Sequence, residues 1–340
     1  MMKLFTTLCA ATLLTGAAAF AQDIHYSQFY ASPMTLNPAL TGAFNGNYRV
    51  GALYRNQWSS VTVPYVTPSF YGDVNNIMPK MVRKGTVNVG VQVVNDKAGD
   101  GELTTMGGLL SGSYVYPLDA DHKHNVAFGM QFGFQNKKLN WTKLVFESNW
   151  NGLGFDPNYG TQDATEKTAS FTSFQWNWGL AYAGILSQQL KVYGGITLFN
   201  LNTAKETFTN YKNDLGMRSV IHMGAEYFIN NKTSLMPNLI FMGQTKAMEF
   251  NIGCSIGYRL KAKPTDATVF GGLYFRAKDA LIAMAGIEYR NTRLGLSYDV
   301  NVSSLSEASG GMGGFELSLQ YIGLIGGIIS EKPIMFCPRF

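Results

Sequence analysis

The sequence predicts an all-β fold, a transmembrane antiparallel β-barrel of the bacterial outer membrane with about 14 strands. Three observations favour it. Apolar residues alternate with small or polar ones in segment after segment, which is the period of a β-strand. Charged residues make up only 14% of the 340-residue chain, well below the roughly 25% of soluble domains. Beyond the N-terminus, no apolar run approaches the roughly 18 residues that a membrane-spanning helix needs.

Residues 1–21 have the features of a secretory signal peptide. Lys3 supplies the positive start, residues 4–14 are apolar, and Ala19-Phe20-Ala21 forms an A-x-A cleavage site. We therefore expect an exported mature chain that begins at Gln22. The formal net charge of +5 is small and its basic residues are dispersed, which argues against a nucleic-acid partner.

The alternation is clear in residues 124–135. The even-numbered positions from Val126 to Phe134 are apolar, and the odd-numbered positions from Ala127 to Gln135 carry only Ala, Gly or Gln. A soluble β-sandwich would carry Lys and Glu on its second face, whereas these faces suit a polar lumen. The strands should close into a barrel, because an open edge in lipid would leave backbone groups unpaired at several kcal/mol each.

The predicted barrel covers residues 48–324. We expect strands at 48–59, 67–75, 86–95, 102–117, 124–135, 171–186, 190–201, 218–229, 233–243, 247–260, 267–276, 279–290, 292–302 and 313–324. With both ends of the barrel-forming chain in the periplasm, the long connections at 136–170, 202–217 and 303–312 face the cell exterior. The connections at 76–85 and 118–123 are longer than a simple barrel predicts for the periplasmic side.

Two segments lie outside the predicted strands. Residues 22–47 combine prolines and glycines with aromatics, so we expect an irregular but apolar segment that lines the periplasmic mouth or plugs the lumen. The tail, residues 325–340, ends in an aromatic residue as outer-membrane assembly signals do, although Pro333 and Pro338 interrupt its alternation.

Sequence motifs for catalysis and for cofactor or metal binding have structural explanations. Gly253 to Gly257 match the G-x-S-x-G elbow of serine hydrolases, but they lie within an alternating strand rather than at a strand-to-helix turn. His122 and His124 lack further ligands at metal-site spacing, and the Asp96–Glu102 loop lacks the spacing of an EF-hand. We therefore predict no enzyme activity, no cofactor and no metal.

Charged residues recur on the lumen-facing side of the later strands. They could pair across the lumen and brace it, or they could contact a plug or an inserted peptide. This predicted lumen charge cluster comprises Glu226, Glu249, Arg259, Arg276, Glu288, Arg290, Arg293, Asp299 and Glu316.

The segment Gln22 to Phe44, QDIHYSQFYASPMTLNPALTGAF, resembles the start of mature PorP/SprF-family proteins of the type IX secretion and gliding apparatus. Residues 48–58 resemble the first strand of that family, and Cys337 to Phe340 are similar to its Cys-Pro-Arg-Phe ending. The matching positions, which are candidate partner-binding residues, are Ser27, Gln28, Phe29, Tyr30, Pro33, Asn37, Pro38, Ala39, Leu40, Gly42, Tyr54, Arg55, Gln57 and Trp58.

The resemblance implies a non-enzymatic outer-membrane barrel of the Bacteroidota that works with the type IX secretion machinery. Its implied partners are periplasmic ring components, a secreted adhesin with a C-terminal secretion domain, or both. The motif residues could contact such partners directly, or they could only fix turns and pack the barrel mouth. A second function remains open, that of a porin or a transporter of hydrophobic solutes.

Overall fold

A computed structural model describes residues 25–60, 63–82, 84–144, 146–156, 169–203, 215–245, 247–262, 265–303 and 306–325. Its strands are β1 (Tyr48–Gln57), β2 (Tyr65–Val74), β3 (Thr86–Ala98), β4 (Leu103–Pro117), β5 (His124–Leu139), β6 (Ala169–Ile185), β7 (Leu190–Phe199), β8 (Arg218–Phe228), β9 (Thr233–Gln244), β10 (Ala247–Ala262), β11 (Thr265–Arg276), β12 (Ala280–Tyr289), β13 (Thr292–Asn301) and β14 (Met312–Gly323).

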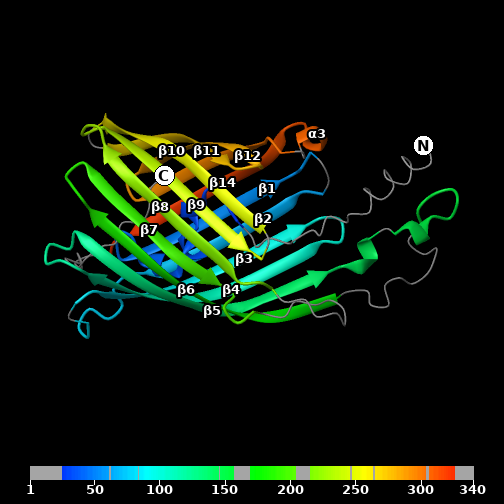
Figure 1. Cartoon of the computed structure of the whole chain (residues 1–340), viewed down its shortest axis with the longest axis horizontal. Coiled ribbons are helices and arrows are strands. Elements are labelled where there is room, and N and C mark those ends of the chain that lie inside the picture. Colours follow the sequence, from blue (N-terminus) through cyan, green and yellow to red (C-terminus); the bar gives the residue numbers. More distant parts are fainter. Residues whose placement is uncertain are drawn as a thin grey trace, which may run out of the picture.

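These strands form one closed antiparallel barrel. Each strand pairs with its neighbours in sequence, and β1 completes the ring by pairing with β14 (Figure 1). The predicted strands are all present, and the predicted fold class is confirmed. None of the helices among the described residues is long and apolar enough to cross a membrane.

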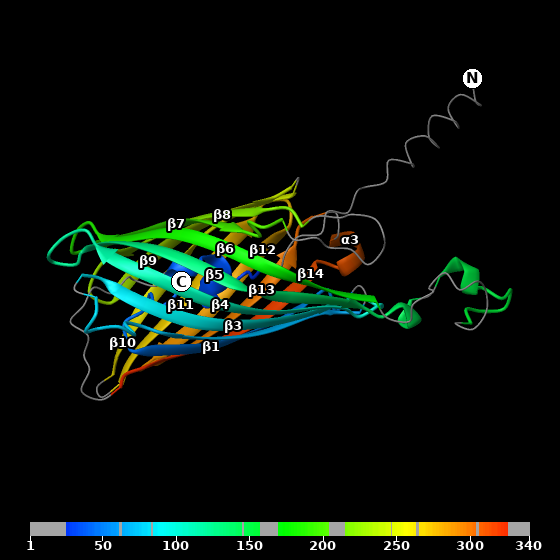
Figure 2. The same ribbon diagram turned by 90° about the horizontal axis from the view of Figure 1, so that it is seen from below.

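The barrel has two distinguishable ends. The described parts of the long β5–β6, β7–β8 and β13–β14 connections lie at one end, and short turns such as 229–232 and 290–291 lie at the other. Because bacterial barrels have long extracellular loops and short periplasmic turns, we call these the outer and inner ends. Helix α3 (Ser306–Ser309) lies at the outer end, as does the long β5–β6 connection (Figure 2).

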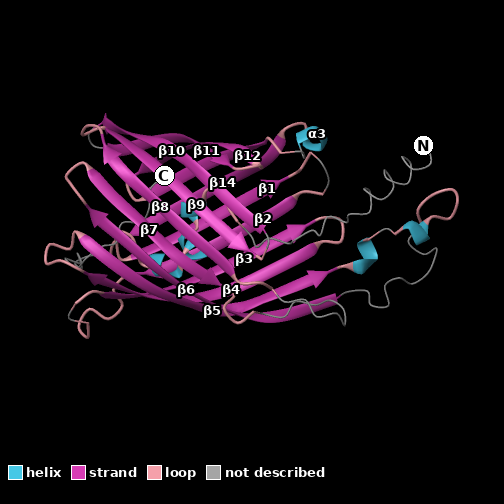
Figure 3. Cartoon of the chain, viewed as in Figure 1, coloured by secondary structure: helices cyan, strands magenta, loops and turns pink. Residues whose placement is uncertain are grey.

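The connection between β5 and β6 contains short helices, η3 (Trp141–Lys143) and η4 (Glu147–Asn149), which are drawn in cyan in Figure 3. The strands that carry it are longer than predicted, since β5 extends to Leu139 and β6 begins at Ala169. The signal peptide and all of the predicted tail except Ile325 lie outside the described residues.

The two faces of the barrel differ as the alternation predicts. Outward-facing side chains such as Phe70, Leu110 and Leu273 are more than half exposed, which suits contact with lipid. Lumen-facing side chains such as Gln131 and Ser255 are fully buried. Their burial requires another part of the chain to fill the lumen.

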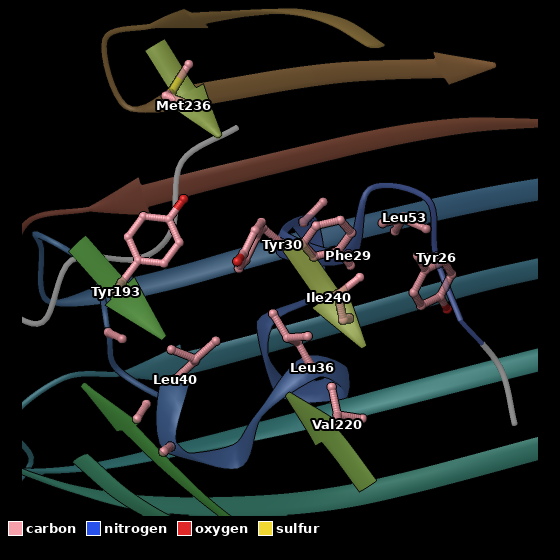
Figure 4. Close-up of a cluster of buried hydrophobic side chains, with 14 of the residues drawn as sticks. Tyr26, Phe29, Tyr30, Leu36, Leu40, Leu53, Tyr193, Val220, Met236 and Ile240 are labelled. Atoms are coloured by element: carbon pink, nitrogen blue, oxygen red, sulfur yellow. The ribbon is translucent and has the colours of Figure 1, made fainter. Parts of the chain in front are cut away.

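The segment that fills the lumen is residues 25–46, which we call the N-terminal plug. It contains η1 (Phe29–Ala31), α2 (Pro33–Leu36) and η2 (Pro38–Leu40), all surrounded by strands. Figure 4 shows plug residues such as Tyr30 and Leu36 packed against barrel residues such as Val220 and Ile240. The hydrophobic core therefore lies inside the barrel. We expected this segment either at the periplasmic mouth or in the lumen, and in the structure it lies in the lumen.

Candidate functional site

The N-terminal plug runs from the outer end of the barrel to the inner end. At its start, Nε2 of His25 lies 3.5 Å from Oε2 of Glu249, which is close to the outer β9–β10 turn. At its finish, the amide of Asn47 donates to the carbonyl of Gly323 at the inner end of β14, 2.9 Å away. The plug thus crosses the whole lumen before the chain turns into β1.

Two carboxylates bind the outer part of the plug through its backbone. Glu316 accepts hydrogen bonds from the amides of Ser27 and Gln28, at 2.7 and 2.8 Å, one to each of its oxygens. Asp299 accepts a hydrogen bond from the Ser27 hydroxyl at 2.7 Å. Both carboxylates are at most 1% exposed, so each one requires a buried positive partner.

Two arginines supply that positive charge. Nη2 of Arg276 lies 2.6 Å from Oδ2 of Asp299, and Arg55 forms an ion pair with Glu316. Both guanidinium groups also donate to the Ser27 hydroxyl, at 2.9 Å from Arg55 and 3.1 Å from Arg276. Arg55, Arg276, Asp299 and Glu316 form the outer charge cluster, which has equal numbers of positive and negative groups.

A second buried ion pair holds the inner part of the plug. Arg49 on β1 and Asp73 on β2 face each other across the sheet, with Nη2 and Oδ2 2.6 Å apart. Asp73 also accepts a hydrogen bond from the amide of Gly42 at 2.7 Å, and Arg49 donates to the carbonyl of Leu40 at 3.1 Å. In this inner ion pair, the carboxylate therefore binds a backbone amide of the plug, and the guanidinium group binds a backbone carbonyl.

Between the outer charge cluster and the inner ion pair, the turn at Asn37 packs closely against wall positions that lack side chains. The Asn37 side chain accepts a hydrogen bond from the amide of Ala39 at 2.9 Å and donates to the carbonyl of Leu180 at 3.0 Å. The facing wall positions are Gly129, Gly179 and Gly195. A Cβ atom at any of them would overlap this turn, and at Gly129 it would overlap the plug backbone itself. The glycines are required for this close approach.

Aromatic side chains pack the space between the plug and the later strands. The ring of Tyr30 lies edge-on to those of Tyr193 and His222, and Phe29 lies edge-on to Tyr274. Each such contact stabilises the fold by about 0.5–1.5 kcal/mol beyond the contribution of the apolar area that it buries.

The family of the chain can be assigned once this geometry is known. A family model described as "Type IX secretion system membrane protein PorP/SprF" matches residues 18–321. The chain belongs to the PorP/SprF family. Because the chain is a closed barrel with an apolar outer face, it is a protein of the outer membrane. No curated protein matches the chain.

The solved structures to which the chain is similar include a channel, a transporter and a porin. The monoaromatic hydrocarbon channel CymD has a TM-score of 0.46 at 13% identity, over 85% of this chain and 91% of that chain. The P. putida toluene transporter TodX has a TM-score of 0.45 at 12% identity, over 84% and 90%. The KdgM porin, in complex with disordered oligogalacturonate, has a TM-score of 0.35 at 9% identity, over 80% and 98%. These likenesses concern the fold alone.

Most family-motif positions belong to the plug, and all of those are buried. Of the motif positions on and after β1, Arg55 belongs to the outer charge cluster, and its Nε donates a hydrogen bond of 3.2 Å to Oε1 of Gln57. Tyr54 faces outward and is 39% exposed. Trp58 lies at the outer end of β1, where its ring contacts that of Tyr65 with 4.9 Å between centroids.

The predicted lumen charge cluster divides into several separate contacts. Arg276, Asp299 and Glu316 meet in the outer charge cluster. Glu226 pairs with Lys191 at 3.1 Å on neighbouring strands, and Glu249 pairs with His25.

The other predicted lumen charges lie apart from the outer charge cluster. Arg293 lies over the ring of Phe270, and Glu288 is half-buried. Arg259 and Arg290 are exposed, and Arg290 lies in the β12–β13 turn because the strand ends at Tyr289. The predicted lumen position is therefore wrong for Arg290, whereas Arg259 shares the lumen-facing side of β10 with Ser255 and is exposed near the inner end of that strand.

The inner ion pair was not predicted from the sequence. Both Arg49 and Asp73 occupy lumen-facing positions of their strands, and the strand register places them directly opposite. The pair could have been predicted from two opposite charges at facing positions, but these positions can be matched only when the register of β1 and β2 is known.

A recess remains at the outer side of the plug. Its lining includes Thr35 of the plug together with Gln175, Asn177, Phe199 and Arg218 of the wall. No group of His, Cys, Asp and Glu side chains suited to a metal ion occurs within the described ranges.

An ion-pair group outside the membrane fixes the start of the long outer loop. Glu102, in the β3–β4 turn, lies 2.6 Å from Nζ of both Lys143 in η3 and Lys97 in β3. The hydrogen bonds from Lys143 and then Lys97 lower the pKa of Glu102 to about 2. Since this pKa lies below the ordinary value of about 4.3, the contact favours the folded loop at neutral pH and is lost as the pH falls toward 2.

We expect the substitution Glu102→Gln to release η3 at neutral pH. A nitroxide attached at Glu147→Cys, with the native cysteines replaced by serine, should become more mobile in this variant by electron paramagnetic resonance. In the chain that keeps Glu102, the same gain in mobility should occur only as the pH falls below about 3. Lys97→Gln is the matched control, because the Lys143 contact remains. Equal mobility in all variants at pH 7 would contradict the prediction.

Proposed function

We propose that the protein is a non-enzymatic barrel component of type IX secretion that binds other proteins at the outer membrane. In this proposal it contacts components of the secretion apparatus and helps to deliver or hold a secreted adhesin at the cell surface. The observation that carries the proposal is the N-terminal plug, which the outer charge cluster and the inner ion pair hold across the lumen. A lumen filled in this way suits a protein that acts through its surfaces and loops rather than as an open channel.

The described residues support a non-enzymatic role in a second way. Ser255, the central residue of the G-x-S-x-G match, is fully buried within β10 and shares a hydrogen bond of 2.9 Å with the hydroxyl of Tyr274. No histidine lies among its hydrogen-bond partners in the described part of the chain. The serine therefore has the contacts of a lumen-filling residue, and it lacks the base that would activate a nucleophile.

The second candidate function is a porin or a transporter of hydrophobic solutes. The recess at the outer mouth is the observation that favours it, because a solute could enter there from outside. Transport would require the plug to leave the lumen or to shift within it. Purified protein in planar bilayers distinguishes the two functions, since a stable open-channel conductance with an intact plug would favour the porin.

Affinity purification tests the proposed function directly. The protein, tagged in an outer loop and extracted from native membranes with mild detergent, should bring with it type IX secretion components or a secreted surface protein. Mass spectrometry identifies these partners, and an unrelated outer-membrane barrel tagged in the same way serves as the control. Recovery of neither class of partner would disprove the proposal.

A further inference from the structure

Strand β6 has an edge at its outer end that none of the described strands covers. Its 17 residues exceed the roughly 9–11 that a barrel strand needs to cross the membrane. On one side it pairs with β5 along its whole length, from Ala169 to Gly184. On the other side, its pairing with β7 reaches only Trp178, because β7 ends at Phe199. The β5–β6 hairpin therefore extends outward beyond β7 (Figures 1 and 2).

The chain after β7 covers the first part of this edge. The amide of Leu201 donates to the carbonyl of Trp176 at 2.9 Å. The Asn202 side chain accepts from the amide of Trp176 at 3.2 Å and donates to the carbonyl of Phe174 at 2.7 Å. The Asn202 side chain thus makes the hydrogen bonds that a neighbouring strand would otherwise make to Trp176 and Phe174. The hydrogen bonds to this edge end at the Phe174 carbonyl.

Beyond that point, the described residues leave the backbone of β6 open on this side. The backbone amide and carbonyl of Trp176 and the carbonyl of Phe174 point away from β5. In a strand, the backbone groups of every second residue point in the same direction. The amide of Phe174 and the backbone groups of Thr172 and Ser170 therefore point to the same uncovered side. No hydrogen bond to these groups on that side occurs among the described residues.

We propose that this edge, from Ser170 to Phe174, is a docking site for an extended strand of a partner protein, which adds to the sheet beside β6. A row of open amides and carbonyls on a strand is recognised best by another strand. The inference rests on the proposed function, because it supplies the contact through which a partner would be held at the cell surface.

The surroundings of the edge define the chemistry of the incoming strand. The outward-facing side chains of Phe174 and Trp176 are 42% and 38% exposed, so apolar residues on the same face of the partner strand would pack beside them. Farther out, β5 presents the exposed Lys138 next to Ser170. The partner strand would lie on the other side of β6, two strand spacings or roughly 10 Å from β5, so an acidic residue at its outer end would complement this charge through the long lysine side chain and not as a direct cross-strand pair.

The test uses two substitutions at one position. Thr172→Pro removes the amide that faces the open edge and leaves the backbone hydrogen bonds between β5 and β6 unchanged, because edge strands tolerate proline where its missing amide is unpaired. Both this substitution and its control also remove the hydrogen bond of 2.9 Å from the Asn136 side chain to the Thr172 hydroxyl, so that loss is common to the two variants. Thr172→Ala keeps the amide and is the matched control. Both variants should assemble as native barrels, which heat-modifiable migration in gels verifies.

The readout is the amount of the secretion component or secreted surface protein, identified by mass spectrometry, that co-purifies with each variant. We expect Thr172→Pro to reduce it about tenfold and Thr172→Ala to leave it unchanged. Equal recovery with Thr172→Pro would overturn the inference and leave the proposed function standing. Recovery of no partner by the unaltered protein would overturn both.

Hydrogen–deuterium exchange resolved to single residues provides an independent measurement. In the purified protein, the amides of Thr172 and Phe174 should exchange quickly, while those of Phe171 and Ser173, which face β5, exchange slowly. Addition of the purified partner should slow only the first pair. Slow exchange of all four amides in the protein alone would mean that the edge is already paired within this chain, and it would overturn the inference.

Discussion

The substitution Gly129→Val should displace the plug and open the lumen to ions. Gly129 on β5 faces the Asn37 turn, and a Cβ atom there would overlap the backbone of Pro38 and Ala39. Backbone atoms held at both ends by buried ion pairs cannot move aside as the end of a flexible side chain does. The plug must therefore leave its seat, and the polar wall that it covered would line an aqueous path. The measurement is single-channel conductance in planar bilayers, where the native protein should stay closed and the variant should conduct.

A matched control for this substitution is Gly107→Val. Gly107 also faces the lumen, but it lines the outer recess and its nearest neighbour is a carbonyl oxygen 3.9 Å away. The added methyl groups would enter open space, so this variant should stay closed. Protease treatment of the Gly129→Val barrel should also cleave residues 25–46, which are protected in the native protein. A closed, protease-resistant Gly129→Val barrel with native heat-modifiability would contradict the prediction.

The strand pattern could be predicted because it depends on local alternation. In β5, each even position from Val126 to Phe134 is apolar, and this period identifies both the strand and its lipid-facing side without knowledge of its neighbours. The lengths of β5 and β6 were underestimated, because their outer ends carry polar residues such as Lys137 and Lys138 that weaken the alternation. These polar ends lie beyond the lipid, where alternation is no longer required.

The candidate site was less predictable, because it depends on contacts between distant segments. Ser27 is separated from Arg276 by most of the chain, yet their side chains hydrogen bond at 3.1 Å. The plug has no period that would indicate its position, so both the lumen and the mouth were consistent with the sequence. Arg49 and Asp73 show the same limit, since only the register of their strands reveals the pair. The resemblance to a family identified important residues of the plug without indicating what they contact.

The substitution Arg276→Met should destabilise the barrel by about 3–5 kcal/mol, because it leaves the carboxylate of Asp299 buried beside a single, more distant cation. Arg276 and Asp299 are each 1% exposed, and the remaining cation, Arg55, lies 3.4 Å from Asp299 and already pairs with Glu316. The free energy of unfolding, measured by urea titration of the barrel in lipid vesicles, should fall by this amount. Asp279→Asn is the matched control. Asp279 also contacts Arg276, but its side chain is 36% exposed, so its loss should cost less than about 1 kcal/mol.

The double variant Arg276→Met, Asp299→Leu separates the effect of an unpaired charge from the effect of lost contacts. If the large cost arises from an unpaired buried charge, removal of both charges should recover much of the stability, and the coupling energy should exceed about 1 kcal/mol. The plug should nevertheless be held more weakly at Ser27. Its hydroxyl loses the hydrogen bonds with Asp299 and Arg276 and keeps the one from Arg55. Faster protease cleavage near residue 27 in this stable double variant would show that the cluster serves to hold the plug. Additive effects of the two substitutions, with unchanged cleavage, would instead assign the cluster to the barrel wall alone.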